Sequence, residues 1–213
     1  MVRVAVDAMG GDNAPGEIVK GCLLALQKSE AVKILLCGRE EILRQLVGQQ
    51  YPAERLEIVP ASEVIETVVS VRKKKDSSLV VGMKLIREER ADAFVSAGNS
   101  GAILVGGQVL VGRLPGVERA PFAPLIPTED GGVTLLLDSG ANVDAKAAHL
   151  VQFAEMGSLY MEKALGIEKP RVAILNVGVE EEKGNALVKE TYPLLKATPG
   201  INFIGSIEAR EVL

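Results

Sequence analysis

FVSAGNSGAIL, residues 94 to 104, is the stretch that decides the fold. An apolar run typical of a β-strand ends at Ser96, and an apolar run with helical spacing begins at Ser100. Between them lie only small residues, which allow a tight turn and leave backbone amides accessible. We interpret the stretch as a strand, a turn and the start of a helix, the repeating unit of parallel α/β proteins.

The same alternation continues through most of the chain. Short runs rich in Val, Ile and Leu predict strands at 2–6, 32–37, 56–59, 93–96, 133–137, 172–176 and 201–204. Segments of 3.6-residue periodicity predict helices at 17–28, 40–47, 77–89, 100–111, 145–165 and 186–196. The strands are nearly all apolar, as expected for a sheet covered on both faces. The expected fold is therefore α/β, a three-layer α/β/α sandwich with a mainly parallel sheet, and residues 114–132 form a long loop or hairpin.

Composition narrows the class of protein. The chain has 213 residues, 47% of them hydrophobic, which is enough for one large core, and we expect a single α/β domain over residues 1–213. Its 24 Lys and Arg against 28 Asp and Glu give a net charge of −4, so no nucleic-acid partner is expected. No signal peptide or spanning segment is recognised, which predicts a cytoplasmic protein. Cys22 and Cys37 are expected to be buried, reduced thiols.

Polar loops follow four of the predicted strands. They read DAMGGDNAP, SAGNSGA, LDSGANVDAK and NVGVEEEKGN, and each combines Gly with Asn, Asp or Ser. One such loop is explained by turns and helix caps alone. Because ligands of parallel sheets bind beyond the carboxyl ends of the strands, four such loops predict an anion-binding rim.

Several familiar chemistries are disfavoured by missing motifs. The chain contains neither G-x-G-x-x-G nor a P-loop, and Ser100 does not lie in G-x-S-x-G. The single histidine, His149, lies in a helical pattern and is expected to be structural or exposed. No metal-ligand spacing is found, so we expect neither a metal nor a cofactor. These features favour a reaction whose nucleophile is supplied by a substrate.

Two basic features leave alternatives open. Arg72, Lys73, Lys74 and Lys75 precede a helix that is expected to begin near residue 76 or 77, where cations oppose the helix dipole. This run is either a solvated, flexible segment or a site that binds an anion or an acidic partner. Lys183 beside the helix start at Asn185 is either a surface lysine or a group that stabilises a phosphate or oxyanion.

Seven segments together carry a resemblance to a known family. They are VAVDAMGGDNAP, RKKKDSS, ADAFVSAGNSGA, LLLDSGANVDAK, HLVQFAEMGSLY, RVAILNVGVEEEKGN and INFIGSIEAR. In order and over nearly the whole chain, they resemble the bacterial phosphate acyltransferases. The resemblance implies a homodimer with the fold of the isocitrate and isopropylmalate dehydrogenases, which phosphotransacetylases share. It also implies that inorganic phosphate attacks the thioester of a long-chain acyl carrier protein to give acyl phosphate for phospholipid synthesis.

The resemblance also implies roles for residues of the polar loops. Lys183 is assigned to charge stabilisation, and Asn99 and Asn185 are placed with it as catalytic residues. The basic run Arg72, Lys73, Lys74 and Lys75 is assigned to carrier-protein docking. The residues assigned to substrate and phosphate are Asp7, Gly10, Gly11, Asp12, Ser96, Ser100, Gly101, Asp138, Gly140, Asn142, Asp144 and Gly178.

This sequence departs from the family pattern at two places. Only TVVSV separates SEVIE from RKKKDSS, where the family has a few more residues. The chain also stops at IEAREVL, where family members continue, so we expect the N-terminal part of a longer chain. The segment that follows in the family is implicated in dimerisation and in peripheral contact with the membrane. The alternatives to the family's reaction are a phosphotransacetylase acting on acyl-CoA and a non-catalytic sensor of phosphate or acyl ligands.

Overall fold

The computed structural model describes residues 1–48, 52, 54–65 and 70–213. It divides into two compact units, Met1–Leu114 (unit 1) and Pro115–Leu213 (unit 2), which we describe separately. The single domain expected over 1–213 stays a prediction. Most of the short connection 67–71 noted in the sequence lies outside the described residues.

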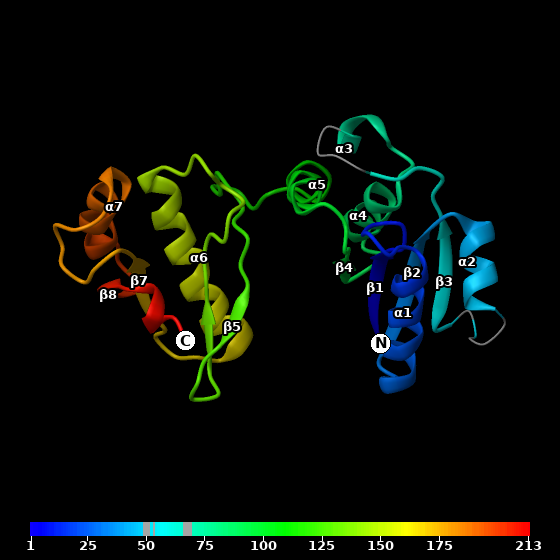
Figure 1. Ribbon diagram of the computed structural model, residues 1–213, viewed down its shortest axis with the longest axis horizontal. Coiled ribbons are helices and arrows are strands. Elements are labelled where there is room, and N and C mark those ends of the chain that lie inside the picture. Colours follow the sequence, from blue (N-terminus) through cyan, green and yellow to red (C-terminus); the bar gives the residue numbers. More distant parts are fainter. Residues whose placement is uncertain (49–51, 53, 66–69) are drawn as a thin grey trace. The chain divides into compact units, whose positions relative to one another are not determined.

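Unit 1 is built on a four-stranded parallel sheet (Figure 1). The strands are β1 (Val2–Asp7), β2 (Val32–Gly38), β3 (Leu56–Pro60) and β4 (Ala93–Val95), in the order β3-β2-β1-β4. In the register of the sheet, Asp7 lies opposite Cys37 on one side, and Val6 lies opposite Val95 on the other. The carboxyl ends of β1 and β4 are therefore neighbours.

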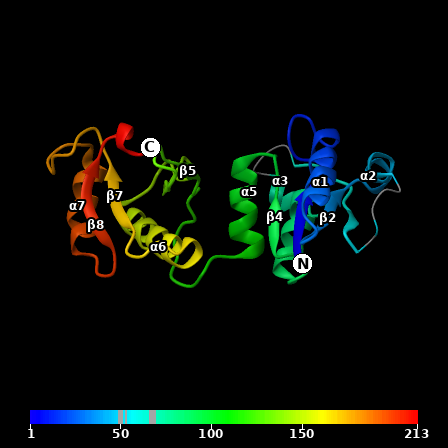
Figure 2. The same ribbon diagram turned by 90° about the horizontal axis from the view of Figure 1, so that it is seen from below.

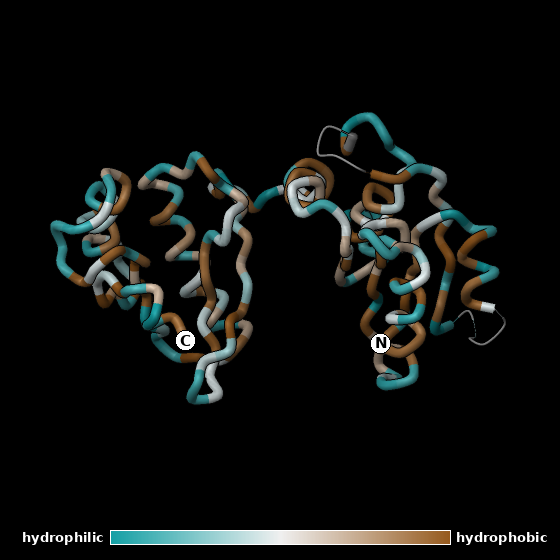
Figure 3. Tube along the Cα trace, in the orientation of Figure 1, coloured by the Kyte–Doolittle hydropathy of each residue, from teal (hydrophilic) through white to brown (hydrophobic). Residues whose placement is uncertain are grey.

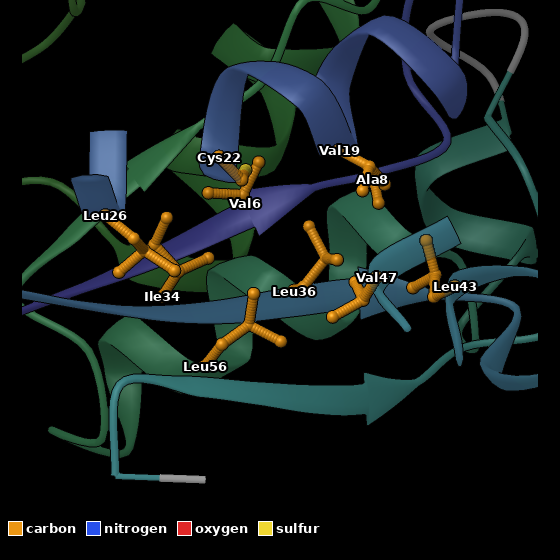
Figure 4. Close-up of a cluster of buried hydrophobic side chains, with 10 residues drawn as sticks. All are labelled: Val6, Ala8, Val19, Cys22, Leu26, Ile34, Leu36, Leu43, Val47 and Leu56. Atoms are coloured by element: carbon orange, nitrogen blue, oxygen red, sulfur yellow. The ribbon is translucent and has the colours of Figure 1, made fainter. Parts of the chain in front are cut away.

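Helices cover both faces of this sheet. On one face, α1 (Gly16–Lys28) and α2 (Glu40–Val47) pack on the alternate strand residues. Figure 4 shows this cluster, which comprises Val6, Ala8, Val19, Cys22, Leu26, Ile34, Leu36, Leu43, Val47 and Leu56. On the other face, Ala5, Leu35 and Cys37 pack with Leu85 of α4 (Ser78–Arg87). The hydrophobic residues along these strands are visible in Figure 3. The expected three-layer, mainly parallel α/β architecture is confirmed.

Two helical segments of unit 1 differ from the prediction. The basic run contains a short helix, α3 (Ser70–Lys73). The helix expected over 100–111 is α5 (Ser100–Gly106), continued by a π-helical segment, η1 (Gly107–Val111). Gly106 is buried at this junction, where a Cβ atom would overlap Met83. The close packing against α4, which periodicity does not reveal, accompanies the change in helix type.

Unit 2 contains two pairs of strands and two long helices. The strand β5 (Leu125–Pro127) is antiparallel to β6 (Val133–Leu135). The region predicted as a loop or hairpin is thus a loop over 115–124 followed by a hairpin whose second strand begins at Val133. The strand β7 (Arg171–Leu175) is parallel to β8 (Asn202–Ile207), and Figure 2 shows this pair beside α7 (Ala186–Ala197). The remaining elements are α6 (Ala147–Leu165) and a 3-10 turn, η2 (Ala209–Glu211).

The two cysteines are buried free thiols, as expected. Burial raises the pKa of Cys22 to about 11 and that of Cys37 to about 12, so both are protonated and unreactive at neutral pH. Among the described residues, no helix is both long and apolar enough to cross a membrane.

Candidate functional site

In unit 1, a hydrogen bond joins the loops that follow β1 and β4. Asp7 is 2% exposed, and its Oδ2 accepts a hydrogen bond of 2.8 Å from Ser96 Oγ. Its Oδ1 accepts a second bond of 3.2 Å from the backbone N–H of Met9. Ser96 Oγ in turn accepts from the N–H of Gly98 at 3.0 Å. The Asp7 carboxylate therefore organises both loops from beneath.

Glycines allow these two loops to approach closely. A Cβ atom on Gly10 would overlap the carboxylate of Asp7 and lie 3.0 Å from Ser96 Oγ. A Cβ atom on Gly98 would lie 3.4 Å from the Cα atom of Gly10. Gly11 has a φ of +106°, a conformation that side chains disfavour, and lies against Ala97. The structure thus brings Asp7, Gly10, Gly11 and Ser96 together, as the sequence suggested.

The loop after β4 ends in a helix cap. Asn99 Oδ1 accepts a 2.9 Å hydrogen bond from the N–H of Ala102, so Asn99 begins α5. Ser100 is exposed and Gly101 half-buried in the first turn. Asp12, in the loop after β1, is also exposed. Asn99 therefore serves as a cap, a local role that the sequence allowed beside a catalytic one.

The basic run of unit 1 is partly built into the structure. Arg72 and Lys73 belong to α3 and are exposed, as is Lys75. Lys74 is half-buried, and its Nζ donates to the carbonyl oxygen of Val64 at 2.7 Å. Ser77 caps α4, close to the predicted start. The run is thus not simply a solvated segment, because Lys74 anchors it.

In unit 2, Asp138 organises the loop that follows β6. Its Oδ1 accepts a 2.6 Å hydrogen bond from the N–H of Phe122, and its Oδ2 accepts a 2.7 Å bond from the N–H of Asn142. Asn142 is buried, and its side-chain amide also donates to the carbonyl oxygen of Ala120 at 3.0 Å. Asp138 and Asn142 therefore fix this loop against residues 120–122.

The last acidic residue of this loop is paired with an arginine that sequence analysis did not single out. Arg119 Nη1 and Nη2 donate to Asp144 Oδ1 and Oδ2 at 3.2 and 3.1 Å. These hydrogen bonds, and the positive charge of Arg119, lower the pKa of Asp144 below its ordinary value. The carboxylate of Asp144 is therefore held as one half of a two-point ion pair.

Lys183 lies across a glycine in the loop that follows β7. A Cβ atom on Gly178 would be 2.6 Å from Lys183 Cδ and 3.1 Å from its Nζ. The ammonium group is bound to the Glu180 carboxylate at 2.9 Å, and the Lys183 side chain is 50% exposed. The hydrogen bond to Glu180, and then the negative charge of Glu180, raise the pKa of Lys183. The predicted pair Lys183 and Gly178 is brought together, with a carboxylate partner.

Asn176 is a residue that sequence reasoning missed. Its Nδ2 donates to the carbonyl oxygen of Lys183 at 3.1 Å, and its Oδ1 accepts from the N–H of Val177 at 2.9 Å. Its backbone N–H donates to Ile207 in the strand β8. Asn176 therefore closes the loop that carries Lys183. Its place directly after an apolar strand is the signal that could have found it.

Asn185 and the loop after β6 border one cavity inside unit 2. Asn185 Oδ1 accepts from the N–H of Val188 at 2.9 Å and caps α7. The cavity has a volume of about 790 Å³, and its lining includes Asp138, Gly140, Asn142 and Asn185, but not Lys183. The structure thus brings four of the assigned residues of unit 2 to a single cavity.

The single histidine is buried and hydrogen-bonded, which agrees with the structural role that was one of the two predicted for it. His149 is buried, its Nδ1 accepts from the N–H of Lys146 at 3.1 Å, and its Nε2 lies 3.1 Å from Glu118 Oε2. Because Nδ1 accepts a hydrogen bond, the neutral ring carries its proton on Nε2. Among the described residues, no group of three or more His, Cys, Asp and Glu side chains could hold a metal ion.

Comparison with known proteins places this geometry in a wider context. A family model described as "Fatty acid synthesis protein" matches residues 2–213. A protein of Brevibacillus brevis named phosphate acyltransferase is 50% identical over 216 residues, which cover 100% of this chain and 64% of that protein. Proteins of the same name from Thermoanaerobacter pseudethanolicus and an Exiguobacterium species are both 49% identical and are covered over 63% and 65% of their lengths. The chain thus spans just under two thirds of these curated relatives.

Proposed function

The chain belongs to the family of fatty acid synthesis proteins, and from this membership we propose that it forms the acyl-transferring part of a phosphate acyltransferase. The reaction proposed transfers a long-chain acyl group from acyl carrier protein to inorganic phosphate. Its products are acyl phosphate, for phospholipid synthesis, and free carrier protein. The name phosphate acyltransferase, carried by relatives about half identical to the whole chain, supports this proposal.

The chemistry of the step is balanced without a nucleophile from the protein. A phosphate oxygen forms a bond to the thioester carbonyl carbon, and the carbonyl electrons move onto the oxygen. Collapse of this tetrahedral intermediate breaks the carbon–sulfur bond and expels the carrier thiolate, which takes up a proton. The protein must hold the reactants together and stabilise the negative oxygen.

We assign stabilisation of that oxygen to Lys183. The observation that carries this assignment is the position of the half-exposed Lys183 side chain against Gly178, with its ammonium group paired to Glu180. Asn176 supports the same loop from below. In unit 2, Asp138, Gly140, Asn142 and Asp144 are the proposed substrate wall, with Asn185 as its amide donor.

In unit 1, we propose a phosphate-facing role for the loops after β1 and β4. Their exposed and half-buried members are Gly11, Asp12, Asn99, Ser100 and Gly101. The buried Asp7, with Ser96 and Gly10, holds these loops in place. We therefore propose that Asp7 positions these loops, whereas the resemblance had implied that it contacts substrate or phosphate.

The proposed partners rest on the charge of the basic run and on membership of the family. Exposed Arg72, Lys73 and Lys75 form a cationic surface for the acidic carrier protein, and Lys74 anchors it through Val64. We also propose a homodimer in the cytoplasm, with peripheral contact to the membrane.

The experiment that tests the function follows phosphate-dependent loss of acyl carrier protein thioester by the purified protein. Replacing Lys183 by Ala should lower kcat by about 100-fold or more with little change in phosphate affinity, as for loss of one oxyanion donor. The matched control is Lys163→Ala, which removes an exposed lysine paired with Glu162. Turnover only with short acyl-CoA would instead indicate a phosphotransacetylase, and phosphate binding without turnover would indicate a sensor.

A further inference from the structure

The cavity of unit 2 has a predominantly apolar interior. Its volume of about 790 Å³ lies within the range of roughly 300 to 1,000 Å³ that small-molecule sites occupy. Four buried apolar side chains from three elements are among its lining residues: Phe153, Met161, Ile174 and Leu195. Because most of its lining residues are apolar, the cavity favours a ligand with a large apolar surface.

The cavity is elongated. All five residues of β7, Arg171–Leu175, line it, which corresponds to about 16 Å of strand at 3.3 Å per residue. Along α6 the lining runs from Leu150 to Met161, which again corresponds to about 16 Å at 1.5 Å per residue. The lining along β7 and the lining along α6 therefore give the same length for the cavity. We call this elongated cavity the unit 2 slot.

Part of the apolar lining is left in contact with solvent. Val133, Leu175 and Ile204 line the slot and are 38%, 43% and 47% exposed. Apolar side chains that line a cavity and remain exposed are stabilised when a ligand covers them. The slot therefore offers both buried and exposed apolar surface to the same ligand.

Polar groups lie at the carboxyl ends of the strands that line the slot. Gly140 follows β6, and Asn185 follows β7 and begins α7; both are exposed and both line the slot. Asp138 and Asn142 line it beside them. The lining also includes Thr134, Ser158, Arg171 and Glu211, although most of its residues are apolar. A ligand with a long apolar chain and a polar group at the end near Gly140 and Asn185 fits this lining.

We propose that the unit 2 slot binds the fatty acyl chain of the substrate, with the thioester carbonyl at the end bordered by Gly140 and Asn185. This inference rests on the proposed function. An extended chain advances about 1.2 Å per bond, so a slot of about 16 Å holds roughly 13 bonds. The slot thereby sets the preferred acyl length at about 14 carbons.

The test fills the slot from α6. Ala154 lines the slot, and Ala154→Phe places an aromatic ring in it. Ala154→Leu is the milder form if the first variant fails to fold. The matched control is Ala148→Phe, because Ala148 lies exposed on the same helix outside the lining. The chain-length profile of kcat/KM is measured with acyl carrier protein thioesters of 8 to about 18 carbons, and binding of myristic acid is measured by calorimetry.

The expected result is a preference near 14 carbons that moves to shorter chains in the slot variants. Each methylene displaced costs about fourfold in affinity, so Ala154→Phe should lower kcat/KM for the longest thioesters more than tenfold relative to 8-carbon thioester. The Ala148→Phe variant should keep the original profile. An unchanged profile in a folded Ala154 variant overturns the proposal.

The binding of myristic acid distinguishes failure of the slot proposal from failure of the proposed function. If the protein turns over no acyl thioester, myristic acid binding that Ala154→Phe weakens and Ala148→Phe leaves intact still supports the slot. If myristic acid binding is absent, or is equal in the two variants, the slot does not hold an acyl chain, whatever the activity.

Discussion

The hydroxyl of Ser96 donates a 2.8 Å hydrogen bond to the buried carboxylate of Asp7, across 89 residues of sequence. The bond joins the ends of two neighbouring parallel strands, β1 and β4. Gly98 donates to the same hydroxyl, so a single side chain connects the carboxylate with the turn that leads to Asn99. The geometry of the turn before α5 therefore depends on a group at the end of β1.

Ser96→Ala should destabilise the protein by about 1.5 to 3 kcal/mol, because it leaves a buried carboxylate without one of its donors. The measurement is urea-induced unfolding. Ser139→Ala is the control, because Ser139 is exposed in unit 2, and it should change the free energy of unfolding by less than about 0.5 kcal/mol. Equal effects of the two substitutions would show that the Asp7–Ser96 bond contributes little.

A second prediction concerns the glycines around this bond. Gly10→Ala should lower stability by about 1 to 3 kcal/mol, because the new Cβ atom overlaps the Asp7 carboxylate, which cannot move away without losing its donors. Gly98→Ala should lower stability less, because the nearest neighbour of a Cβ atom on Gly98 would be Ser96 Oγ, at 3.1 Å. Gly107→Ala is the control, because its Cβ atom would meet no atom within 4 Å. Thermal unfolding of the three variants gives the ranking.

Much of the fold was predictable from local pattern. The strands β1 and β2 are continuous apolar runs, and their burial in a parallel sheet follows from composition alone. The π-helical end of the helix after Ser100 was not predictable, because it accompanies packing of Gly106 on Met83, more than twenty residues earlier. The pairing of β5 with β6 is a local hairpin, but the sequence left a loop as the alternative, because β5 is only three residues long and lies among prolines.

The candidate site shows the same division between local and long-range features. Helix starts were predicted at Ser100 and at Asn185, and Asn99 and Asn185 cap these helices, because capping is a local interaction. The pairing of Asp144 with Arg119 was not identified, since it joins a loop to a segment 25 residues away. The burial of Asp7 could not be predicted either. A polar residue at the carboxyl end of a strand suggests a ligand-binding position, whether its side chain is buried or exposed.

A third prediction uses the ion pair of Lys183. Glu180 raises the pKa of Lys183, and Lys183 lowers the pKa of Glu180. The pair thus stabilises the fold over the interval between these two values; this contribution is lost at acid pH as Glu180 gains its proton and at alkaline pH as Lys183 loses one. Glu180→Gln should move the pKa of Lys183 down toward its ordinary value, as followed by NMR titration of the lysine side chain.

The same substitution has a consequence for catalysis. Because Glu180 and the developing oxyanion compete for one ammonium group, Glu180→Gln should raise kcat by several-fold with little change in KM for phosphate. Glu181→Gln is the matched control, because Glu181 pairs with Lys196 instead. A kcat that falls in Glu180→Gln while the protein stays folded would contradict the assignment of Lys183 to the negative oxygen of the intermediate.

A fourth prediction concerns Asn176 as a positioning residue. Asn176→Ala removes the bond to the carbonyl oxygen of Lys183 and should lower kcat by about 10- to 100-fold through misplacement of the ammonium group. KM for the acyl thioester should change little. Asn202→Ala is the control, because it removes a similar bond, to the carbonyl oxygen of Lys169, in the same unit. Loss of stability without loss of kcat would assign Asn176 to folding alone.

The last prediction separates two roles of Asn185. As the cap of α7 it accepts from Val188, and Asn185→Ala should cost about 0.5 to 2 kcal/mol of stability. Asn185→Asp keeps the accepting oxygen and adds a negative charge at the positive end of the helix, so its stability should equal or exceed that of the original protein. If the side-chain amide also donates to the reacting groups, Asn185→Asp should nevertheless lose at least about tenfold in kcat, because it exchanges a donor for a negative charge. Urea unfolding and steady-state kinetics on the same preparations measure the two effects, and full activity in Asn185→Asp would limit Asn185 to capping.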